Sequence, residues 1–496
     1  MLAKSRRVEG FWFQPPGIRM RPYASSVTLA PYGADGWQGE VKPLDERGTF
    51  FLPIKPNPDG SGSAFLVDVE ANRGIFQQVK PVSLEGSTVR LFGNERGETL
   101  QRVLFEGQYA EGKVIFPNLR PLIDATYDFE KDEDSSSAFY PRGKPPARYR
   151  YTPPVKLDDG WPVATLEEVG IERGAIESFV QMLIDQPITS VRDPQIHAVL
   201  IARHGKLVLE EYFHGHHRDQ PHDLRSASKS WVAVLIGAAM QAGIPIKLNT
   251  PLYQTMLGEL PADLDPRKRA MTLEHLLTMT AGYDCTDRGD NRPGDEDVMQ
   301  SQTEEPDWYQ YTLKVPMVSM PGEKIVYCSL EPHLAGGVLE KVAKEPLPEL
   351  FDRLVARPLH MGTYHLQITP TGTAYGGGRH HFLPRDFMKL AQLMMNDGKW
   401  GAKQITTKEW ARKSTAALRD ISPEQQYGYL WNSKEYPYKD QKVRGYFAAG
   451  NGGQIFMAIP DLDLAITFLG GNYSDGETLR IPQRVFIPKN ILPAVK

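Results

Sequence analysis

The feature that most constrains the fold is the apolar run Trp231–Met240, which continues after Gln241 to Ile246. The run is shorter than the roughly 20 residues that a membrane span needs. It has no polar face, so it predicts a helix buried on all sides. Such a helix needs other elements packed around it, and we therefore expect a large layered domain without a membrane span.

Composition narrows the class of protein further. The 496 residues suggest two or three domains, and the net charge of −4 gives no general field for nucleic acid or an anionic membrane. Two cysteines exclude a disulfide scaffold and a multi-cysteine zinc site, but they leave open a bridge between Cys285 and Cys328. The basic N-terminus has no apolar run behind it, so as written it predicts a cytoplasmic protein; a truncated N-terminus would make it periplasmic or secreted.

Short apolar runs separated by turn residues fill residues 1 to about 140. Many short strands at such spacing are typical of a small sandwich or barrel. The runs are Thr49–Ile54, Ala64–Val69, Ser87–Phe92, Val103–Phe105 and Lys113–Phe116. We therefore predict a separate N-terminal all-β domain over residues 1–140, without a catalytic motif.

A proline-rich stretch follows this region. After the acidic, serine-rich segment Asp128–Ser137, prolines occupy positions 141, 145, 146, 153 and 154. Proline at this density stiffens the chain and blocks helix formation. The pattern predicts a linker over residues 141–160, with the boundary near residue 150.

The pattern of helices and hairpins over residues 161–496 predicts an α+β domain. Apolar residues at helical spacing occupy Ile171–Ile184. A hairpin is predicted over 196–209, around His204-Gly205, and a second over 454–469. Because the two hairpins flank a helix-rich middle, we expect one antiparallel sheet built from both ends of the domain, flanked by helices and carrying a helical insert.

Ser226 and Lys229 form an S-x-x-K motif at the start of the buried run. On a helix, residues three apart are neighbours, so the amine lies one turn from the hydroxyl. Burial should lower the pKa of Lys229, which would let it share or accept the serine proton. Two structural alternatives remain: a helix-capping Ser226 with an exposed Lys229, and a second register in which Ser228 pairs with Lys229.

Two further features carry polar groups suited to catalysis. Tyr327 follows a Pro-Gly turn and precedes the helical stretch Leu334–Val342. A phenol beside a lysine ammonium can hold a lowered pKa and act as a general base, although a tyrosine here is more often a core residue. The glycine-rich segment Ala449–Gln454 can expose backbone N–H groups to an oxyanion, or can simply be a turn.

These three features occur in the order used by the serine β-lactamase/penicillin-binding superfamily, which residues 160–480 resemble. Within the superfamily the sequence is similar to class C-like serine hydrolases, the group of esterases, D-amino-peptidases and 6-aminohexanoate-oligomer hydrolases. The resemblance implies a β-lactamase/transpeptidase-like fold with Ser226 as nucleophile. Further segments that fit it are Thr272–Gly282, Arg357–Met361, Gly376–Gly378 and Pro384–Asp386.

Two positions depart from the family pattern. The second motif often ends in Asn, where this chain has Ser329; its hydroxyl could bond substrate or Lys229 but lacks the paired donor and acceptor of an amide. The third motif normally carries a cation, where Asn451 occupies the most probable position. Because that cation meets the carboxylate of a β-lactam or peptide, its absence favours neutral esters or amides.

The sequence therefore predicts a serine hydrolase that cleaves a small-molecule carboxylic ester or amide. Ser226 carries the acyl group, and Tyr327, assisted by Lys229, moves the proton. Oxyanion and substrate contacts are expected from Gly450, Asn451 and Ser329. No cofactor, metal or nucleic acid is required, and the oligomeric state stays open. The alternatives are a penicillin-interacting D-Ala-type peptidase or β-lactamase, and a catalytically silent binding protein on the same fold.

Two segments near these motifs allow different interpretations. Adjacent His216 and His217 cannot easily face one metal, so a solvated loop is favoured over a zinc site, and His380-His381 is interpreted in the same way. The acidic segment Tyr283–Glu305 either lines the active site or forms a solvated loop. The histidines before the S-x-x-K motif are His214, His216, His217 and His222.

Overall fold

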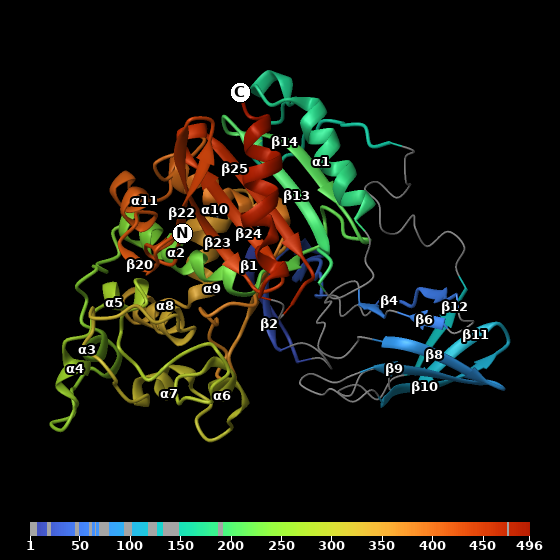
Figure 1. Ribbon diagram of the computed structural model, residues 1–496. Helices are drawn as coiled ribbons and strands as arrows, with labels where there is room; N and C mark the ends of the chain where they lie inside the picture. The colour runs from blue at the N-terminus through green and yellow to red at the C-terminus, as the bar shows by residue number, and fades with distance from the viewer. Residues whose placement is uncertain are drawn as a thin grey trace.

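An eight-stranded antiparallel sheet forms the centre of the computed structural model, in the order β14-β13-β25-β24-β23-β22-β21-β20 (Figure 1). The structure describes residues 7–16, 21–44, 49–58, 62–64, 66–68, 79–93, 102–117, 126–131, 148–186, 192–473 and 476–496. The strands of this sheet are β13 (Ile196–Arg203), β14 (Lys206–Tyr212), β20 (Arg419–Ser422), β21 (Gln425–Tyr427), β22 (Asn432–Tyr438), β23 (Gln441–Gly450), β24 (Gln454–Ile459) and β25 (Leu464–Gly470).

Both predicted hairpins belong to this sheet. β13 pairs with β14 through the two-residue turn His204-Gly205, whose φ angles of 54° and 67° are the positive values such a turn requires. β24 pairs with β25, and β13 pairs with β25. The two ends of the domain therefore meet in one antiparallel sheet, and the predicted α+β fold class is confirmed.

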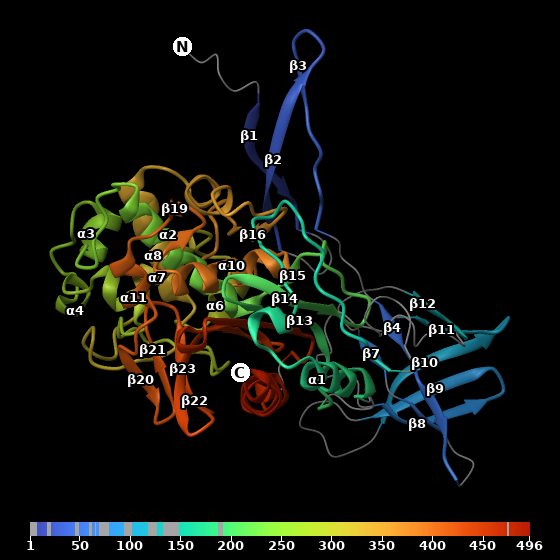
Figure 2. The same ribbon diagram turned by 90° about the horizontal axis from the view of Figure 1, so that it is seen from above.

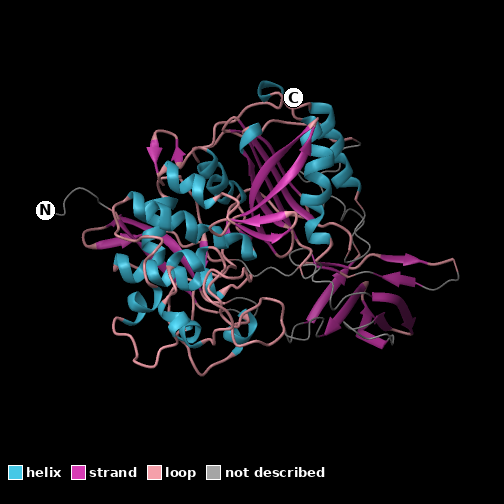
Figure 3. Ribbon diagram, turned by 60° about the vertical axis from the view of Figure 1, so that its left-hand side comes forward, coloured by secondary structure: helices cyan, strands magenta, loops and turns pink. Residues whose placement is uncertain are grey.

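Helices cover both faces of the sheet (Figure 3). On one face, α1 (Arg173–Asp185) places Phe179 against Phe468 of β25 and Phe486 of the C-terminal helix η8 (Pro482–Ile491). On the other face, α10 (Pro384–Met395) packs Phe387 against Phe456 of β24, with ring centroids 4.7 Å apart. All residues of β13, β24 and β25 are consequently buried.

The helical insert lies between β14 and β20 in the sequence. Its first long helix, α2 (Ser230–Gln241), is the predicted buried helix: residues 230–239 are all buried. Trp410 packs against Gly237, where a Cβ would lie 2.1 Å from the indole, so only glycine allows the contact. The other helices of this part are α3 (Leu252–Leu257), α4 (Pro266–Arg269), α5 (Leu273–Leu277), α6 (Glu296–Ser301), α7 (Trp308–Lys314), α8 (Leu330–Ala343), α9 (Leu347–Phe351) and α11 (Lys408–Ser414).

No helix in the described ranges is both long enough and apolar enough to cross a bilayer.

In its described residues, the N-terminal region up to residue 131 contains strands and no helix, as predicted. A seven-stranded sheet in the order β12-β11-β10-β9-β8-β6-β5 encloses a small core around Leu66, Leu91 and Phe116. Its strands are β5 (Ile54–Pro56), β6 (Gly62–Ala64), β8 (Val79–Glu85), β9 (Thr88–Gly93), β10 (Arg102–Ala110), β11 (Lys113–Pro117) and β12 (Thr126–Glu130), with β4 (Phe50–Phe51) and β7 (Val67–Asp68) paired beside it. Residues 141–147 of the proposed linker lie outside the described residues, so its boundaries stay a prediction.

A smaller sheet connects the N-terminus to the C-terminal part of the chain. Strand β2 pairs with β16, where Ser25 lies opposite His365, and the sheet continues through β17 to β15. The first strands therefore pack with the C-terminal part rather than with the seven-stranded sheet, and their far end extends away from the body (Figure 2). The strands are β1 (Val8–Gln14), β2 (Tyr23–Tyr32), β3 (Gly36–Gln38), β15 (His222–Asp223), β16 (His365–Gln367) and β17 (His381–Phe382); β18 (Lys399–Trp400) and β19 (Lys403–Gln404) form a separate pair.

Candidate active site

The S-x-x-K motif lies on the helical turn η4 (Arg225–Lys229), which leads directly into α2. Lys229 Nζ is 2.9 Å from Ser226 Oγ, the contact that the i, i+3 spacing predicts. Ser228 is fully buried and donates its hydroxyl hydrogen to the Arg225 carbonyl at 2.7 Å. The geometry therefore selects the Ser226–Lys229 register and assigns Ser228 to the support of the turn.

The expected direction of the Lys229 pKa shift is wrong. Burial alone does lower the pKa of this amine, which is 2% exposed, but its interactions with Tyr327 and with the carboxylates of Glu296 and Asp287 raise it by more. The pKa of Lys229 therefore lies above its ordinary value. Lys229 is an ammonium that donates to Ser226, rather than an amine ready to accept its proton.

Tyr327 lies beside this ammonium. Lys229 Nζ is 5.0 Å from the centre of the Tyr327 ring, within the range of a cation–π contact. The predicted alternative of a core tyrosine does not apply, because Tyr327 is 37% exposed while Cys328 and Ser329 after it are fully buried. The hydroxyl, the amine and the phenol, up to 101 positions apart in the sequence, are thus brought to one place.

The glycine-rich segment closes the other side of the nucleophile turn. Gly450 ends β23, and a Cβ at this position would lie 2.3 Å from the Leu224 carbonyl oxygen and 2.9 Å from the Ala227 nitrogen. Only glycine lets the strand approach so closely. Gly452 and Gly453 both have φ of 96°, in the region that favours glycine, and they turn the chain toward β24.

The Beta-lactamase family model matches residues 196–474, which is more than half of the chain. This protein belongs to the Beta-lactamase family. The resemblance that its motifs show is confirmed, and the chain is a member of a hydrolase family with the β-lactamase/penicillin-binding fold.

Solved structures share this fold. A putative 6-aminohexanoate-dimer hydrolase from Bacillus anthracis is 18% identical with a TM-score of 0.50, and the likeness covers 60% of this chain and 79% of that one. EstCE1, a hydrolase with promiscuous acyltransferase activity, is also 18% identical with a TM-score of 0.50, over 62% of this chain and 96% of that one. At this identity the likeness shows the fold alone. No curated protein sequence matches the chain.

Ser329, the last residue of the second family motif, is hydrogen-bonded to a partner that the sequence does not reveal. Ser329 lies at the start of α8, and its hydroxyl and backbone nitrogen both donate to the Asp287 carboxylate. Ser329 makes no hydrogen bond to Lys229, which was one of its expected roles. Its side chain is fully buried, and it supports the loop that carries Asp287 in this Beta-lactamase family member. A substrate contact from Ser329 stays a prediction.

A disulfide joins the same two segments. Cys285, two residues before Asp287, is bridged to Cys328, which lies between Tyr327 and Ser329. Both cysteines are buried. The bridge left open by the sequence is thus present, and it fixes the acidic segment beside Tyr327. Of the two interpretations of this segment, Asp287 and Glu296 favour the one in which it lines the site of this family member.

The acidic groups near Lys229 give the site a negative field. Burial and the neighbouring Glu296 raise the pKa of Asp287 to about 6, although Lys229 and the bonds from Ser329 oppose the shift. Glu331 is buried, and burial raises its pKa well above the usual range, although it accepts a hydrogen bond from the Ala281 nitrogen. The carboxylates of Asp287 and Glu296 therefore face the Lys229 ammonium in this member of the Beta-lactamase family.

Arg225, directly before Ser226, holds an unusual backbone conformation. Its φ of 48° is positive, which is costly for a residue with a side chain, and the surroundings fix it. Asp223 accepts from the Arg225 backbone nitrogen at 2.9 Å and pairs with its guanidinium at 2.8 Å, while the Tyr473 ring lies 4.7 Å below the guanidinium. Burial would raise the pKa of Asp223, but Arg225 lowers it to about 2, so the pair stays charged.

The histidine-rich segment is only partly the solvated loop that the sequence predicts. His217 is exposed as expected, but His222 is buried, and burial lowers its pKa to about 4. His380 is a core residue that accepts from the Gln367 nitrogen at 2.9 Å and packs against Trp231. His381 packs on Tyr23, with ring centroids 5.1 Å apart.

Sequence reasoning missed the groups that surround the catalytic candidates. Asp287, Glu296 and Glu331 lie in irregular or unremarkable sequence, and no motif marks them. The one available signal was Cys285, because a bridge to Cys328 would bring the acidic segment to Tyr327. The sequence shows that a Cys285–Cys328 bridge is possible, but it does not show that the bridge forms.

Proposed function

We propose that this protein is a serine hydrolase that cleaves carboxylic esters or amides through an acyl-enzyme on Ser226. The observation that carries the proposal is the 2.9 Å contact between Lys229 Nζ and Ser226 Oγ, with the exposed Tyr327 beside the same amine. Membership of a hydrolase family and the approach of Gly450 to the nucleophile turn support it.

The proton path follows from the charge on Lys229. Because Lys229 is an ammonium, it stabilises negative charge on the Tyr327 oxygen and on Ser226 Oγ rather than taking a proton itself. Tyr327 enters this step as a phenolate beside the ammonium, and its oxygen accepts the Ser226 hydroxyl hydrogen as Oγ forms its bond to the substrate carbonyl carbon. The proton then passes from Tyr327 to the leaving alcohol or amine as its bond to that carbon breaks.

Deacylation uses the same groups in reverse. A water gives its proton to Tyr327 and attacks the acyl carbon, and the proton returns to Ser226 Oγ as the acid leaves. In both steps the carbonyl oxygen becomes negative, and we expect the backbone N–H groups of Ser226 and of residues 450–451 to donate hydrogen bonds to it. The left-handed conformation of Arg225, held by Asp223, orients the Ser226 backbone in this scheme.

The charges around the site favour neutral over anionic substrates. Asp287 and Glu296 place negative charge near Lys229, and Asn451 stands where the family pattern has a cation. A substrate carboxylate, as in a penicillin or a peptide C-terminus, would meet repulsion from the carboxylates without the usual cation to offset it. Esters and amides without a carboxylate next to the scissile bond fit this field better.

The experiment compares wild type with Ser226→Ala on a panel of nitrophenyl esters, linear amides and D-amino-acid peptides. We expect the variant to lose ester turnover and labelling by a fluorophosphonate probe, with an unchanged thermal unfolding profile. Ser301→Ala, which changes an exposed serine on α6, is the matched control and should keep both.

Other outcomes identify the alternatives. Full activity of Ser226→Ala would place the nucleophile elsewhere. A stable mass increase on Ser226 after penicillin treatment, without ester hydrolysis, would indicate a penicillin-interacting peptidase or β-lactamase. No reaction with any probe or substrate would indicate a silent binding protein on the same fold.

A further inference from the structure

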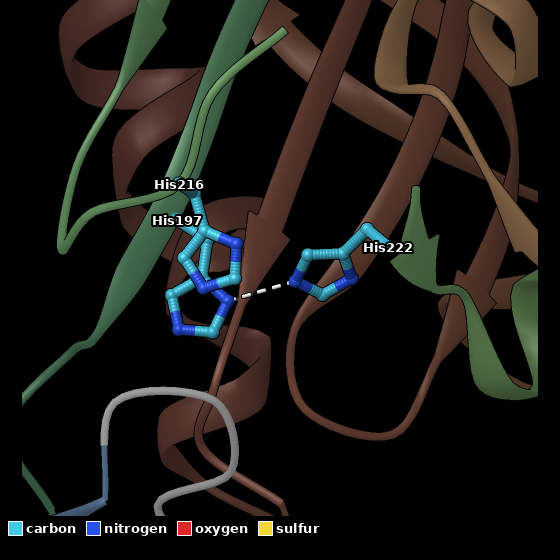
Figure 4. Close-up of side chains that lie close together, drawn as sticks. All are labelled: His197, His216 and His222. Carbon is cyan, nitrogen blue, oxygen red and sulfur yellow. Dashed lines mark hydrogen bonds between the residues drawn. The ribbon is translucent and has the colours of Figure 1, made fainter. Parts of the chain in front are cut away.

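Three histidines, one from β13, one from the loop after β14 and one from β15, meet just ahead of the turn that carries Ser226. His197 is the second residue of β13, His216 lies in the loop after β14, and His222 lies in β15 (Figure 4). One ring nitrogen from each lies within 4.8 Å of the others. We propose that His197, His216 and His222 form a binding site for a zinc-class divalent transition metal.

The positions of the rings suit a shared cation. His197 and His216 are stacked, with centroids 3.9 Å apart and an interplanar angle of 17°, so both present a ring edge to the same side. His197 Nδ1 lies 2.7 Å from His222 Nε2. Ligand nitrogens around tetrahedral zinc are about 3.3 Å apart, given Zn–N bonds of about 2.0 Å. Binding through these nitrogens therefore requires the separation between His197 Nδ1 and His222 Nε2 to open from 2.7 Å to about 3.3 Å.

A backbone contact orients the lone pair of His222 toward the cluster. His222 Nδ1 is 3.0 Å from the carbonyl oxygen of Asp223. A carbonyl can only accept, so Nδ1 carries the hydrogen and Nε2, the nitrogen facing His197, keeps its lone pair. Histidines that bind metals are fixed in this way, with the second nitrogen donating to a carbonyl or carboxylate.

The surroundings of His197 can adapt to metal binding. In the structure, His197 Nδ1 donates to His222 Nε2, and the Gln195 amide nitrogen lies 3.4 Å from His197 Nε2. To bind through Nδ1, His197 must carry its hydrogen on Nε2 instead. An amide has both a donor and an acceptor, so Gln195 can serve either tautomer by turning over.

The local packing keeps room for these rings. A Cβ at Gly471 would lie 2.6 Å from His197 Nε2, so glycine is required beside the imidazole. His197 is fully buried and His222 is 6% exposed, while His216 is only partly buried. The partly exposed His216 lies on the side from which a cation could enter, and three-histidine zinc sites use a water as the fourth ligand.

The donor set identifies the class of metal. Imidazole nitrogens suit zinc, copper and nickel, whereas magnesium and calcium prefer oxygen ligands. A bound metal would tie the turn after β14 to β13 and to β15, whose last residue lies three positions before Ser226. It would therefore stabilise the segment that leads to the nucleophile turn.

The experiment measures metal binding in the full chain, independently of hydrolysis. Protein stripped with a chelator is dialysed against Zn²⁺ and analysed for metal content, its unfolding temperature is measured with and without Zn²⁺, and Co²⁺ is added as a spectroscopic probe of nitrogen coordination. We expect one zinc per chain, a higher unfolding temperature with zinc, and a Co²⁺ visible spectrum typical of low coordination number.

Variants assign the metal to these residues. His216→Ala should weaken zinc binding at least about 100-fold, since loss of mere supporting contacts in metal sites already costs 10- to 100-fold. His217→Ala, the exposed neighbour, should bind as wild type does. His222→Gln serves as a second ligand variant, because it keeps the size of the side chain.

Two results would overturn the proposal. Folded wild type that retains no stoichiometric zinc and shows no thermal shift has no such site. Zinc binding that is equally strong in wild type, His216→Ala and His222→Gln would place the metal elsewhere on the chain.

Discussion

The turn that carries Ser226 and Lys229 and the acidic segment around Asp287 meet at the same site, but they are held there in different ways. Ser226 and Lys229 lie at the start of a helix whose residues 230–239 are all buried, so the hydrophobic core fixes them. The segment with Asp287 has no helix or strand between Tyr283 and α6, and the Cys285–Cys328 bridge and the bonds to Ser329 hold it. The site thus combines a part fixed by packing with a part fixed by one covalent bond and a few polar contacts.

This difference separates two kinds of contribution. Packing places the nucleophile with little dependence on pH or redox conditions, because apolar burial involves no titration. The acidic segment places charges, and charges respond to protonation and to the bridge that positions them. The predictions below test whether the two regions contribute in these separate ways.

The largest effect is expected at the two groups that move or stabilise the proton. Lys229→Ala and Tyr327→Phe should each lower kcat/KM by about 100-fold or more, the usual range for loss of acid–base assistance. Steady-state hydrolysis of a nitrophenyl ester measures this. Lys324→Ala, which removes an exposed lysine three residues from Tyr327, is the control and should hydrolyse the ester normally. Normal rates in Tyr327→Phe would remove the phenol from the mechanism.

The second-largest effect is expected on the stability of helix α2, which packing in the core holds in place. Leu235 in α2 is fully buried, and Leu235→Ala should lower the free energy of unfolding by about 2–5 kcal/mol through lost burial and a cavity. At temperatures where the variant is folded, its kcat should stay close to that of wild type. Urea denaturation and ester kinetics on the same sample measure both quantities. A folded variant with much lower kcat would show that the turn is not fixed by the wider core.

Loss of the Cys285–Cys328 bridge should affect the acidic segment that carries Asp287. The Cys285→Ser, Cys328→Ser double variant opens a link across 43 positions, for which chain entropy predicts a loss of up to about 4 kcal/mol of stability. Because the bridge also positions the segment beside Tyr327, kcat should fall even where the protein is folded. Unchanged kcat together with a lower unfolding temperature would limit the bridge to a purely structural role.

The smallest effect is a change in pH dependence. Asp287 has its pKa raised to about 6 in the folded protein, so the folded state holds this proton more tightly than the unfolded state does. Its contribution to stability is therefore full below the unfolded pKa of about 4 and is lost as the pH rises toward 6. Asp287→Asn should remove this loss, so its unfolding temperature relative to wild type should increase between about pH 4 and 6.

The Asp287→Asn variant keeps an oxygen that can accept from Ser329, which makes it a near-isosteric test. Its kcat should lose any ionisation near pH 6 that wild type shows. Identical pH profiles of stability and rate in the two proteins would show that Asp287 does not titrate in this range.

Much of the fold was predictable because it depends on local patterns. The all-apolar run after Ser226 could only be a buried helix, and the positive φ values of His204-Gly205 follow from a two-residue turn between two strands. The pairing of β13 with β25 followed from hairpins at both ends of the domain. The pairing of β2 with β16 was not predictable, because two short strands 340 residues apart carry no signal of their register.

The sequence alone singled out Ser226, Lys229 and Tyr327 as catalytic candidates, because each stands at a fixed spacing from a helix start or a turn. Only the tertiary structure decided the charge on Lys229 and the partner of Ser329. It also decided that Ser226 rather than Ser228 is hydrogen-bonded to Lys229, and it brought the three histidines together. The physical reason is that burial and Coulomb interactions depend on distances through space, and residues far apart along a chain acquire those distances only when it folds.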